Sequence, residues 1–214
     1  VSRQLMIKSL RQFKIWRDNY CSPIRLALNV SPTQIATESF AWTVGDLLCD
    51  AELLPCDIQL EITEDLFLDD NPVVNLNLEP FNTLGVSLVI DDFGMGHGGY
   101  AYLKRFRFSG IKIDRSVVSG VAHNPLDVAI VKSMVSLAAD ADLGLTAEGI
   151  ETSQQNDAVR TLGLRSGKGY QHGTPMEAQT FDDHYSRHYA SAARPSPSIQ
   201  LAPVLGAQQV SVGA

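Results

Sequence analysis

The sequence predicts an α/β fold with a parallel sheet, of the TIM-like (β/α) barrel type. Short apolar segments of strand length alternate with longer segments of helical period along the first 189 residues. Polar residues stand at the carboxyl ends of successive strand segments, where a parallel barrel gathers its functional groups. About six strands can be counted where a closed barrel needs eight. We therefore expect the chain to lack the first strand or strands of the barrel. The missing part would precede Val1.

The first third of the chain is predicted to fold as helix, strand, helix and strand. Apolar residues at helical spacing predict a helix over 5–16, and the segment RLALNV predicts a strand over 25–30. A second helical pattern covers 34–50 and ends before Leu54-Pro55. The alternating segment DIQLEIT then predicts a strand over 57–63.

The middle of the chain continues this alternation. Asn71-Pro72 begins a predicted helix that ends at Leu84-Gly85, and Pro80 within it is expected to kink it. The apolar, β-branched run over 86–90 predicts a buried strand, which ends in Asp91 and Asp92. A helix is expected through 102–106, followed by a strand over 110–113.

The last third has a long helix, a strand, a shorter helix and a tail. Asn124-Pro125 caps the long helix, a strand follows over 143–147, and Thr152 caps a helix that ends near Leu162-Gly163. A weak strand is expected around Gly169-Tyr170. Residues 190–214 are rich in Ala, Ser and Pro without any period, which predicts a disordered tail after a domain that spans 1–189.

Composition narrows the classes of function. The formal net charge of -7 argues against a protein that coats a nucleic-acid polymer, because that role needs a basic face. The chain has no apolar run long enough to span a bilayer and no leader segment, which favours a cytoplasmic location. The three cysteines lack the spacing of a metal site and are expected to be reduced.

The polar residues at the strand ends predict a metal site. They are an amide, several carboxylates and one lysine: Asn29, Glu61, Asp91, Asp92, Lys112 and Glu148. Oxygen ligands of this kind suit Mg²⁺ or Mn²⁺. Two such metals would activate water against a phosphodiester, which predicts hydrolysis. An enolase-like barrel, with acids on strand ends and a lysine base, is the rival interpretation.

Five motifs follow one another along the chain: LNVSP at 28–32, QLEITED at 59–65, IDDFGMG at 90–96, IKIDRSVV at 111–118 and TAEGIET at 146–152. Together they resemble the EAL domain, a family of bacterial phosphodiesterases specific for cyclic di-GMP. The resemblance implies a TIM-like barrel of EAL type and a hydrolase that cleaves cyclic di-GMP to the linear dinucleotide. It also implies a site for two metals, Mg²⁺ or Mn²⁺.

The resemblance assigns roles residue by residue. Metal ligands are implied at four positions: Asn29, Glu61, Asp91 and Asp92. Lys112 matches a lysine that contacts the catalytic water, and Glu148 matches the general base. Glu64 matches a glutamate that supports the loop after the two aspartates, and Glu151 an acid near the metals. For Glu64, Glu151 and Asp114, a helix cap or a surface acid is an equally good interpretation.

Two departures from the family pattern bear on activity. The Glu-Ala-Leu motif itself does not occur, so one metal ligand is expected to be missing, and Lys168 stands where the family reads glutamine. A lysine there would place positive charge near the metals or pair with one of the acids. His97 and His172 are each better explained as loop residues than as ligands.

The sequence thus leaves three interpretations open. The chain is a weakly active cyclic di-GMP phosphodiesterase, or an inactive module that binds cyclic di-GMP or a protein, or a fragment of a longer signalling protein. The third interpretation is compatible with the second and adds upstream sensory or cyclase-like domains as partners. The family resemblance also implies that the chain can pair as a homodimer.

Overall fold

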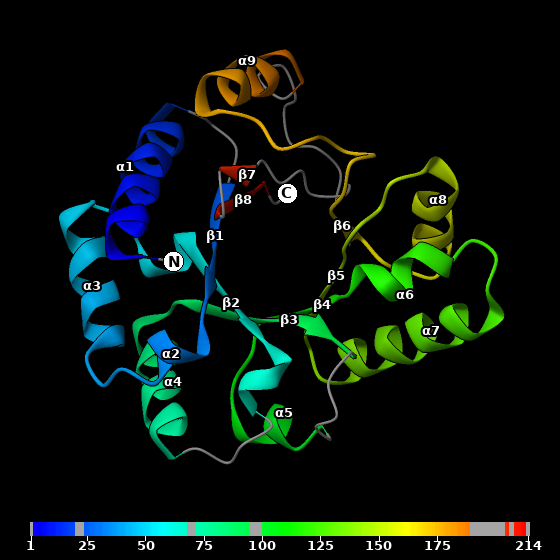
Figure 1. Cartoon of the computed structure of the whole chain (residues 1–214), viewed down its shortest axis with the longest axis horizontal. Helices are drawn as coiled ribbons and strands as arrows, with labels where there is room; N and C mark the ends of the chain where they lie inside the picture. Colours follow the sequence, from blue (N-terminus) through cyan, green and yellow to red (C-terminus); the bar gives the residue numbers. More distant parts are fainter. Residues whose placement is uncertain are drawn as a thin grey trace.

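A curved sheet of eight strands forms the centre of the molecule in the described part of the chain. The structure is a computed structural model that describes residues 2–19, 24–67, 72–94, 100–188, 204–205 and 208–212. The strand order is β6-β5-β4-β3-β2-β1-β8-β7. Strands β1 to β6 are parallel and follow chain order, whereas β8 pairs antiparallel with β1 and with β7. The parallel strands curl as a half-barrel with helices on its outer side (Figure 1).

The strands are β1 (Ile24–Val30), β2 (Ile58–Thr63), β3 (Ser87–Phe93), β4 (Gly110–Ile113), β5 (Gly144–Ala147), β6 (Ser166–Gly167), β7 (Val204–Leu205) and β8 (Gln208–Val212). The α-helices are α1 (Arg3–Asn19), α2 (Pro32–Ile35), α3 (Phe40–Asp50), α4 (Pro72–Leu84), α5 (Ala101–Arg105), α6 (Arg115–Gly120), α7 (Pro125–Asp140), α8 (Ser153–Thr161) and α9 (Ala178–His188). Two 3-10 helices, η1 (Pro55–Asp57) and η2 (Glu64–Phe67), flank β2.

The predicted alternation of strands and helices is confirmed, and several helix ends lie where their capping residues predict. Asn124 accepts a hydrogen bond from Leu126 N at the start of α7, and Thr152 forms a capping box at the start of α8. Helix α4 continues through Pro80 and ends before Gly85, which adopts a φ of 86°. A positive φ of this size favours glycine, so the sequence signal for the helix end has a direct backbone cause.

Three predicted boundaries are wrong. The helix expected over 34–50 is divided into α2 and α3, because residues 36–39 form a turn. Strand β3 extends through Asp91 and Asp92 to Phe93, since Phe93 is fully buried and continues the pairing with β4. The last parallel strand lies at 166–167 rather than around Gly169-Tyr170, because Gly169 adopts a φ of 155° and leaves the ladder.

Several elements were not predicted from the sequence. These are α6, α9, the two 3-10 helices and the strands β7 and β8. The two strands fall within the segment 190–214, for which disorder was expected. The rest of that segment, 190–203, 206–207 and 213–214, lies outside the described residues, as does His97.

Two apolar clusters hold the helices against the outer side of the sheet. The first joins alternate residues of β1 and β2, such as Leu28 and Leu60, to helices α1, α3, α4 and α9. The second joins Ile90 and Ile111 to helices α6, α7 and α8. Because side chains alternate along a strand, packing of these residues outward directs their neighbours to the inner side of the half-barrel. The inner side therefore receives the polar residues.

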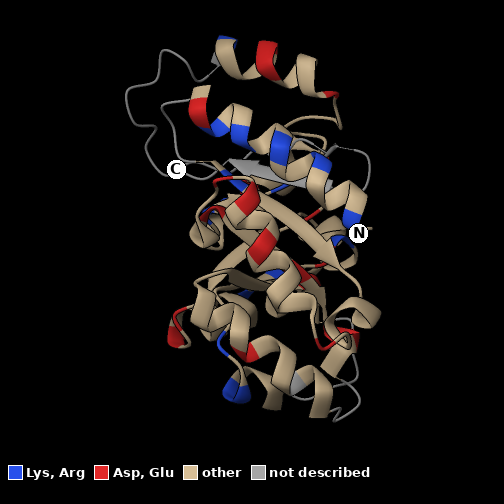
Figure 2. Cartoon of the chain, turned by 90° about the vertical axis from the view of Figure 1, so that its left-hand side faces the viewer, with Lys and Arg blue, Asp and Glu red and all other residues tan. Residues whose placement is uncertain are grey.

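Charge is unevenly distributed over the outer surface. Helix α1 carries five basic residues and one acid, although the whole chain has a net charge of -7. Figure 2 shows these basic residues along the helix that begins near the label N. Among the described residues, no helix has both the length and the apolar character that crossing a membrane requires.

Helix α4 offers a matched test of the core. Leu78 is fully buried, whereas Leu76, two residues away, is 71% exposed. We expect Leu78→Ala to lower the free energy of unfolding by about 2–5 kcal/mol, and Leu76→Ala to change it by less than about 0.5 kcal/mol. Urea denaturation followed by circular dichroism measures both. Equal losses for the two variants would contradict the packing of α4 described above.

Candidate functional site

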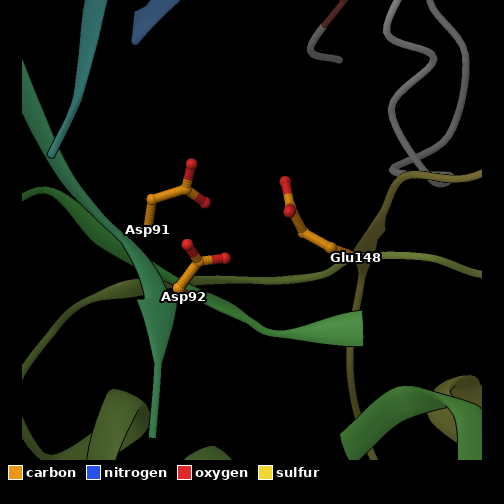
Figure 3. Close-up of side chains that lie close together, drawn as sticks. All are labelled: Asp91, Asp92 and Glu148. Atoms are coloured by element: carbon orange, nitrogen blue, oxygen red, sulfur yellow. The ribbon is translucent and has the colours of Figure 1, made fainter. Parts of the chain in front are cut away.

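Two adjacent aspartates face the same region because β3 contains a bulge. The pairing of β3 with β4 shifts register between Ile90 and Phe93, and Asp92 adopts a φ of 54°. In a regular strand, neighbouring side chains point to opposite sides of the sheet. The bulge keeps Phe93 in the core and still allows Asp91 and Asp92 to approach Glu148, which directly follows β5. Carboxylate oxygens of Asp91, Asp92 and Glu148 lie within 4.8 Å of one another (Figure 3).

Lys112 forms ion pairs with three acids, Glu61 on β2, Asp91 on β3 and Glu148 after β5. It lies on β4 between β3 and β5 and is only 3% exposed. Its Nζ lies 2.7 Å from Glu61 Oε2, 2.9 Å from Asp91 Oδ1 and 2.5 Å from Glu148 Oε1. A buried ammonium group needs compensation for its lost hydration, and three carboxylates supply it here. We name Glu61, Asp91, Asp92, Lys112 and Glu148 the acid–lysine cluster.

Strands β1 and β2 complete one side of the cluster. Asn29 pairs in register with Glu61, so both side chains point to the inner side. The Asn29 amide lies 3.1 Å from Glu61 Oε2 and 3.2 Å from Asp91 Oδ2, and its NH₂ group satisfies both acceptors. Gln59, two residues before Glu61, donates a hydrogen bond of 3.2 Å to Glu61 Oε1. These contacts orient the Glu61 carboxylate from two sides.

Main-chain hydrogen bonds place Lys168 beside Glu148. Lys168 N donates to Ala147 O at 2.8 Å, and Ile150 N donates to Lys168 O at 3.0 Å. Gly169 is required at this junction, because a Cβ there would lie 2.2 Å from Ile150 O. Lys168 Nζ then donates to Glu148 Oε1 at 3.1 Å. Glu148 Oε1 therefore lies against two ammonium groups, those of Lys112 and Lys168.

Burial and neighbouring charges shift the pKa values in the cluster. Burial raises the pKa of Asp91 to about 6, although Lys112 acts in the opposite direction. Burial, assisted by the charges of Asp114 and Glu148, also raises the pKa of Asp92. For Glu148 the effect of burial is outweighed by Lys112 and Lys168, which together lower its pKa.

The two lysines are shifted in opposite directions. Burial alone would lower the pKa of Lys112, but Glu61, Glu148 and Asp91 raise it well above its usual value. The pKa of Lys168 is lowered by burial and by the nearby Lys112. The three carboxylates around Lys112 therefore keep this lysine charged at neutral pH.

Glu64, expected to support the loop after the two aspartates, lies outside the cluster and is buried. Its Oε2 accepts a hydrogen bond of 3.0 Å from Gly94 N, and its Oε1 accepts one of 3.0 Å from Tyr102 OH. Gly94 directly follows β3, so this carboxylate connects η2 to the chain just beyond the two aspartates. The residues 95–99 that follow lie outside the described part of the chain.

The other secondary candidates lie at helix starts or in loops. Asp114 caps α6 through Ser116 N at 2.8 Å, and hydrogen bonds of this kind outweigh burial and lower its pKa. Glu151 forms an ion pair of 2.8 Å with Arg115 and does not join the acid–lysine cluster. His172 also lies apart from the cluster, and burial lowers its pKa.

The donor set of the cluster fits a hard divalent cation. Asp91, Asp92 and Glu148 can each offer one oxygen to a common point. Asn29 stands beside Asp91 with its NH₂ group toward the carboxylate, so its amide would have to turn to offer an oxygen. Carboxylate and amide oxygens suit Mg²⁺, Mn²⁺ and Ca²⁺. Glu61 contacts Lys112 and Asn29 but does not belong to the group of three acids whose oxygens converge.

A cavity of about 560 Å³ lies inside the half-barrel, mainly at the amino ends of the strands, and Asp91, Asp92 and Glu148 are not part of its lining. Glu61, Lys112 and Lys168 line its upper part, and Ser109 and Gly144 line it near the amino ends of the strands. This volume is within the range of small-molecule sites, roughly 300–1,000 Å³. The cavity therefore meets the cluster only at Glu61 and Lys112, and it also reaches Lys168.

Sequence reasoning missed three residues that shape the site. Gln59 orients Glu61, Tyr102 binds Glu64, and Gly169 allows the close contact of the chain beside Glu148. For Gln59 a signal was available, because a residue two positions before Glu61 faces the same side of a strand. For Tyr102 and Gly169, no signal in the sequence identifies the partner.

Comparisons with known proteins agree with this geometry. The EAL domain family matches residues 1–175. MucR of Pseudomonas aeruginosa, a bifunctional diguanylate cyclase/cyclic di-GMP phosphodiesterase, is 34% identical over 179 residues. These residues are 84% of this chain and 26% of MucR, so the chain spans about a quarter of that relative.

Solved structures show the same fold. The MucR phosphodiesterase in complex with c-di-GMP superposes with a TM-score of 0.78, and the match covers 83% of this chain and 72% of that one. The EAL domain of Mycobacterium smegmatis DcpA gives 0.80 at 29% identity, covering 86% and 83%. Klebsiella pneumoniae BlrP1, solved with cyclic di-GMP and calcium or manganese, gives 0.69 and 0.68 at 25% and 26% identity, each match covering 75% of this chain and 40% of BlrP1.

Removal of the central ammonium group tests the electrostatics of the cluster. Lys112→Met leaves buried carboxylates without their main counter-charge, so we expect the free energy of unfolding at pH 8 to fall by about 3–5 kcal/mol without added metal. The Asp91 pKa, already near 6, would rise further, because Lys112 lowers it in the unmodified chain.

The expected loss depends on pH. A carboxyl whose pKa is raised by folding stabilises the fold at low pH, where it is protonated, and this contribution is lost as pH rises through the raised pKa. The loss caused by Lys112→Met should therefore shrink between pH 8 and pH 5. Urea denaturation at both values measures it, with the exposed Lys8→Met as control. An equal loss at both values would indicate a packing effect instead.

The bulge predicts an unusual preference at position 92. Because Asp92 has a φ of 54°, Asp92→Gly should be more stable than Asp92→Ala by about 1 kcal/mol. The exposed Asp46 in the middle of α3 should show the opposite order, since glycine weakens a regular helix. Thermal or urea denaturation of the four variants checks this. If alanine were the better residue at both positions, the bulge would be disproved.

Proposed function

Because this chain belongs to the EAL domain family, we propose that it binds cyclic di-GMP on the inner side of the half-barrel and hydrolyses it to the linear dinucleotide. The observation that carries the proposal is the acid–lysine cluster, in which carboxylates from β2, β3 and the end of β5 meet around Lys112. A cavity inside the half-barrel reaches the cluster at Glu61 and Lys112, and it also reaches Lys168.

Divalent metal is part of the proposal. Asp91, Asp92 and Glu148 would hold the ion, and Asn29 would add an oxygen once its amide turns away from the carboxylates. The chemistry that Mg²⁺ or Mn²⁺ supplies in such a site is activation of water and stabilisation of the departing oxygen of a phosphodiester. The residues of the chain supply the orientation and the charges around it.

Lys112 and Glu148 have distinct roles in the proposed reaction. Lys112 remains protonated because three carboxylates face it, so it can donate hydrogen bonds and neutralise phosphate charge. Glu148 remains ionised because two lysines lower its pKa, so it can accept a proton from water. Its contact with both lysines also limits how strongly it attracts that proton, which favours slow turnover.

A second candidate function is binding without turnover. The ion pair between Lys168 and Glu148 favours it, because it occupies an oxygen that the reaction needs. The chain would then act as a receptor for cyclic di-GMP. The two functions share the same site and differ only in whether the ligand is cleaved.

The deciding experiment is chromatography of cyclic di-GMP after incubation with the folded chain and Mg²⁺ or Mn²⁺. We expect the linear dinucleotide to form slowly, formation to stop on addition of a chelator, and Glu148→Gln to lower the rate by about 10²–10⁴-fold. Lys8→Gln, on the exposed side of α1, is the matched control and should not change the rate.

Persistence of the cyclic compound would contradict hydrolysis and favour the receptor. Calorimetric titration of the chain with cyclic di-GMP then separates a receptor from a protein that does not bind it. Absence of both turnover and binding would overturn the proposed function.

A further inference from the structure

Lys168 occupies a position in which its charge competes with a bound cation. Its Nζ lies 3.1 Å from Glu148 Oε1, and both side chains are largely shielded from solvent. The same oxygen already lies 2.5 Å from Lys112 Nζ. A cation bound by Glu148 would lie close to two ammonium groups that already contact this carboxylate.

The position of Lys168 is set by the backbone and not by the ion pair alone. Hydrogen bonds from Lys168 N to Ala147 O and from Ile150 N to Lys168 O keep the two segments side by side. The close approach of Gly169 to Ile150 leaves no room for displacement there. The backbone therefore holds position 168 beside Glu148 whichever side chain it carries. We expect that the charge at position 168 can be changed with little change to the fold.

We propose that Lys168 is a positioning residue that holds Glu148 and weakens the binding of a divalent cation to the acidic cluster. This inference rests on the proposed metal site. Lys168 would lower the affinity for the metal through its contact with the Glu148 carboxylate. The cluster contains four carboxylates, and two lysines, Lys112 and Lys168, contact them. Removal of the Lys168 charge would leave the site more negative and so more attractive to a cation.

The test is calorimetric titration of the chain with Mn²⁺ alone, without nucleotide. A unit charge a few ångströms from a cation in a partly buried site has a large effect on binding. We expect Lys168→Gln and the similarly shaped Lys168→Met to bind Mn²⁺ at least about tenfold more tightly than the unmodified chain. Circular dichroism confirms that each variant is folded.

Three controls separate the ion pair from other effects. Lys168→Arg retains the charge and should bind Mn²⁺ within about threefold of the unmodified chain. Lys8→Gln removes the same charge from the exposed side of α1 and should have no effect. In the Glu148→Gln background the gain from Lys168→Gln should fall below about threefold, because the shared oxygen no longer carries charge.

The possible results are distinct. If the unmodified chain binds Mn²⁺ as tightly as both neutral variants, the metal site stands and the role of Lys168 is overturned. The role of Lys168 is also overturned if Lys168→Gln raises the affinity for Mn²⁺ equally with and without Glu148→Gln. Lys168 would then act on the cation through its long-range charge and not through Glu148. If no variant binds Mn²⁺, the metal site is wrong and this inference fails with it.

Discussion

The arrangement of the site depends on a single buried ammonium group that is shared by three carboxylates. Glu61 lies on β2, Asp91 lies on β3 and Glu148 directly follows β5, and each carboxylate would repel the others at the distances that the fold imposes. Lys112 makes that proximity tolerable because its charge lies between them in a region with little water. Asn29 and Gln59 then supply donors to the remaining oxygens. The sheet can therefore assemble with acids at its inner side.

Most of the sheet could be predicted because each parallel strand carries a local signal. The runs around Leu28, Leu60 and Ile111 are short, apolar and bounded by turn residues, and their side chains pack outward as the period requires. The signals failed where tertiary contacts decide. Phe93 extends β3 past two charged residues because the core accepts its ring, and no local pattern reveals that space.

The chemistry of the site was predicted in type but not in arrangement. The positions of Asn29, Glu61, Asp91 and Lys112 at strand ends follow from the register of a parallel sheet. For Lys168 the sequence predicted pairing with one of the acids as one of two alternatives, but not that the partner is Glu148, because that contact depends on main-chain hydrogen bonds between segments about 20 residues apart. Sequence motifs indicate which residues meet, whereas the distribution of charge among them requires coordinates.

The bulge in β3 also bears on how this segment can change in evolution. Of three consecutive residues, Asp91 and Asp92 face the acid–lysine cluster and Phe93 enters the core, and the extra residue of the bulge makes this possible. A substitution alters one of these surroundings, but loss or gain of one residue between Ile90 and Phe93 would exchange all of them together. Length at this point is therefore constrained more strongly than identity, so variation here can proceed by replacement but not by insertion or deletion.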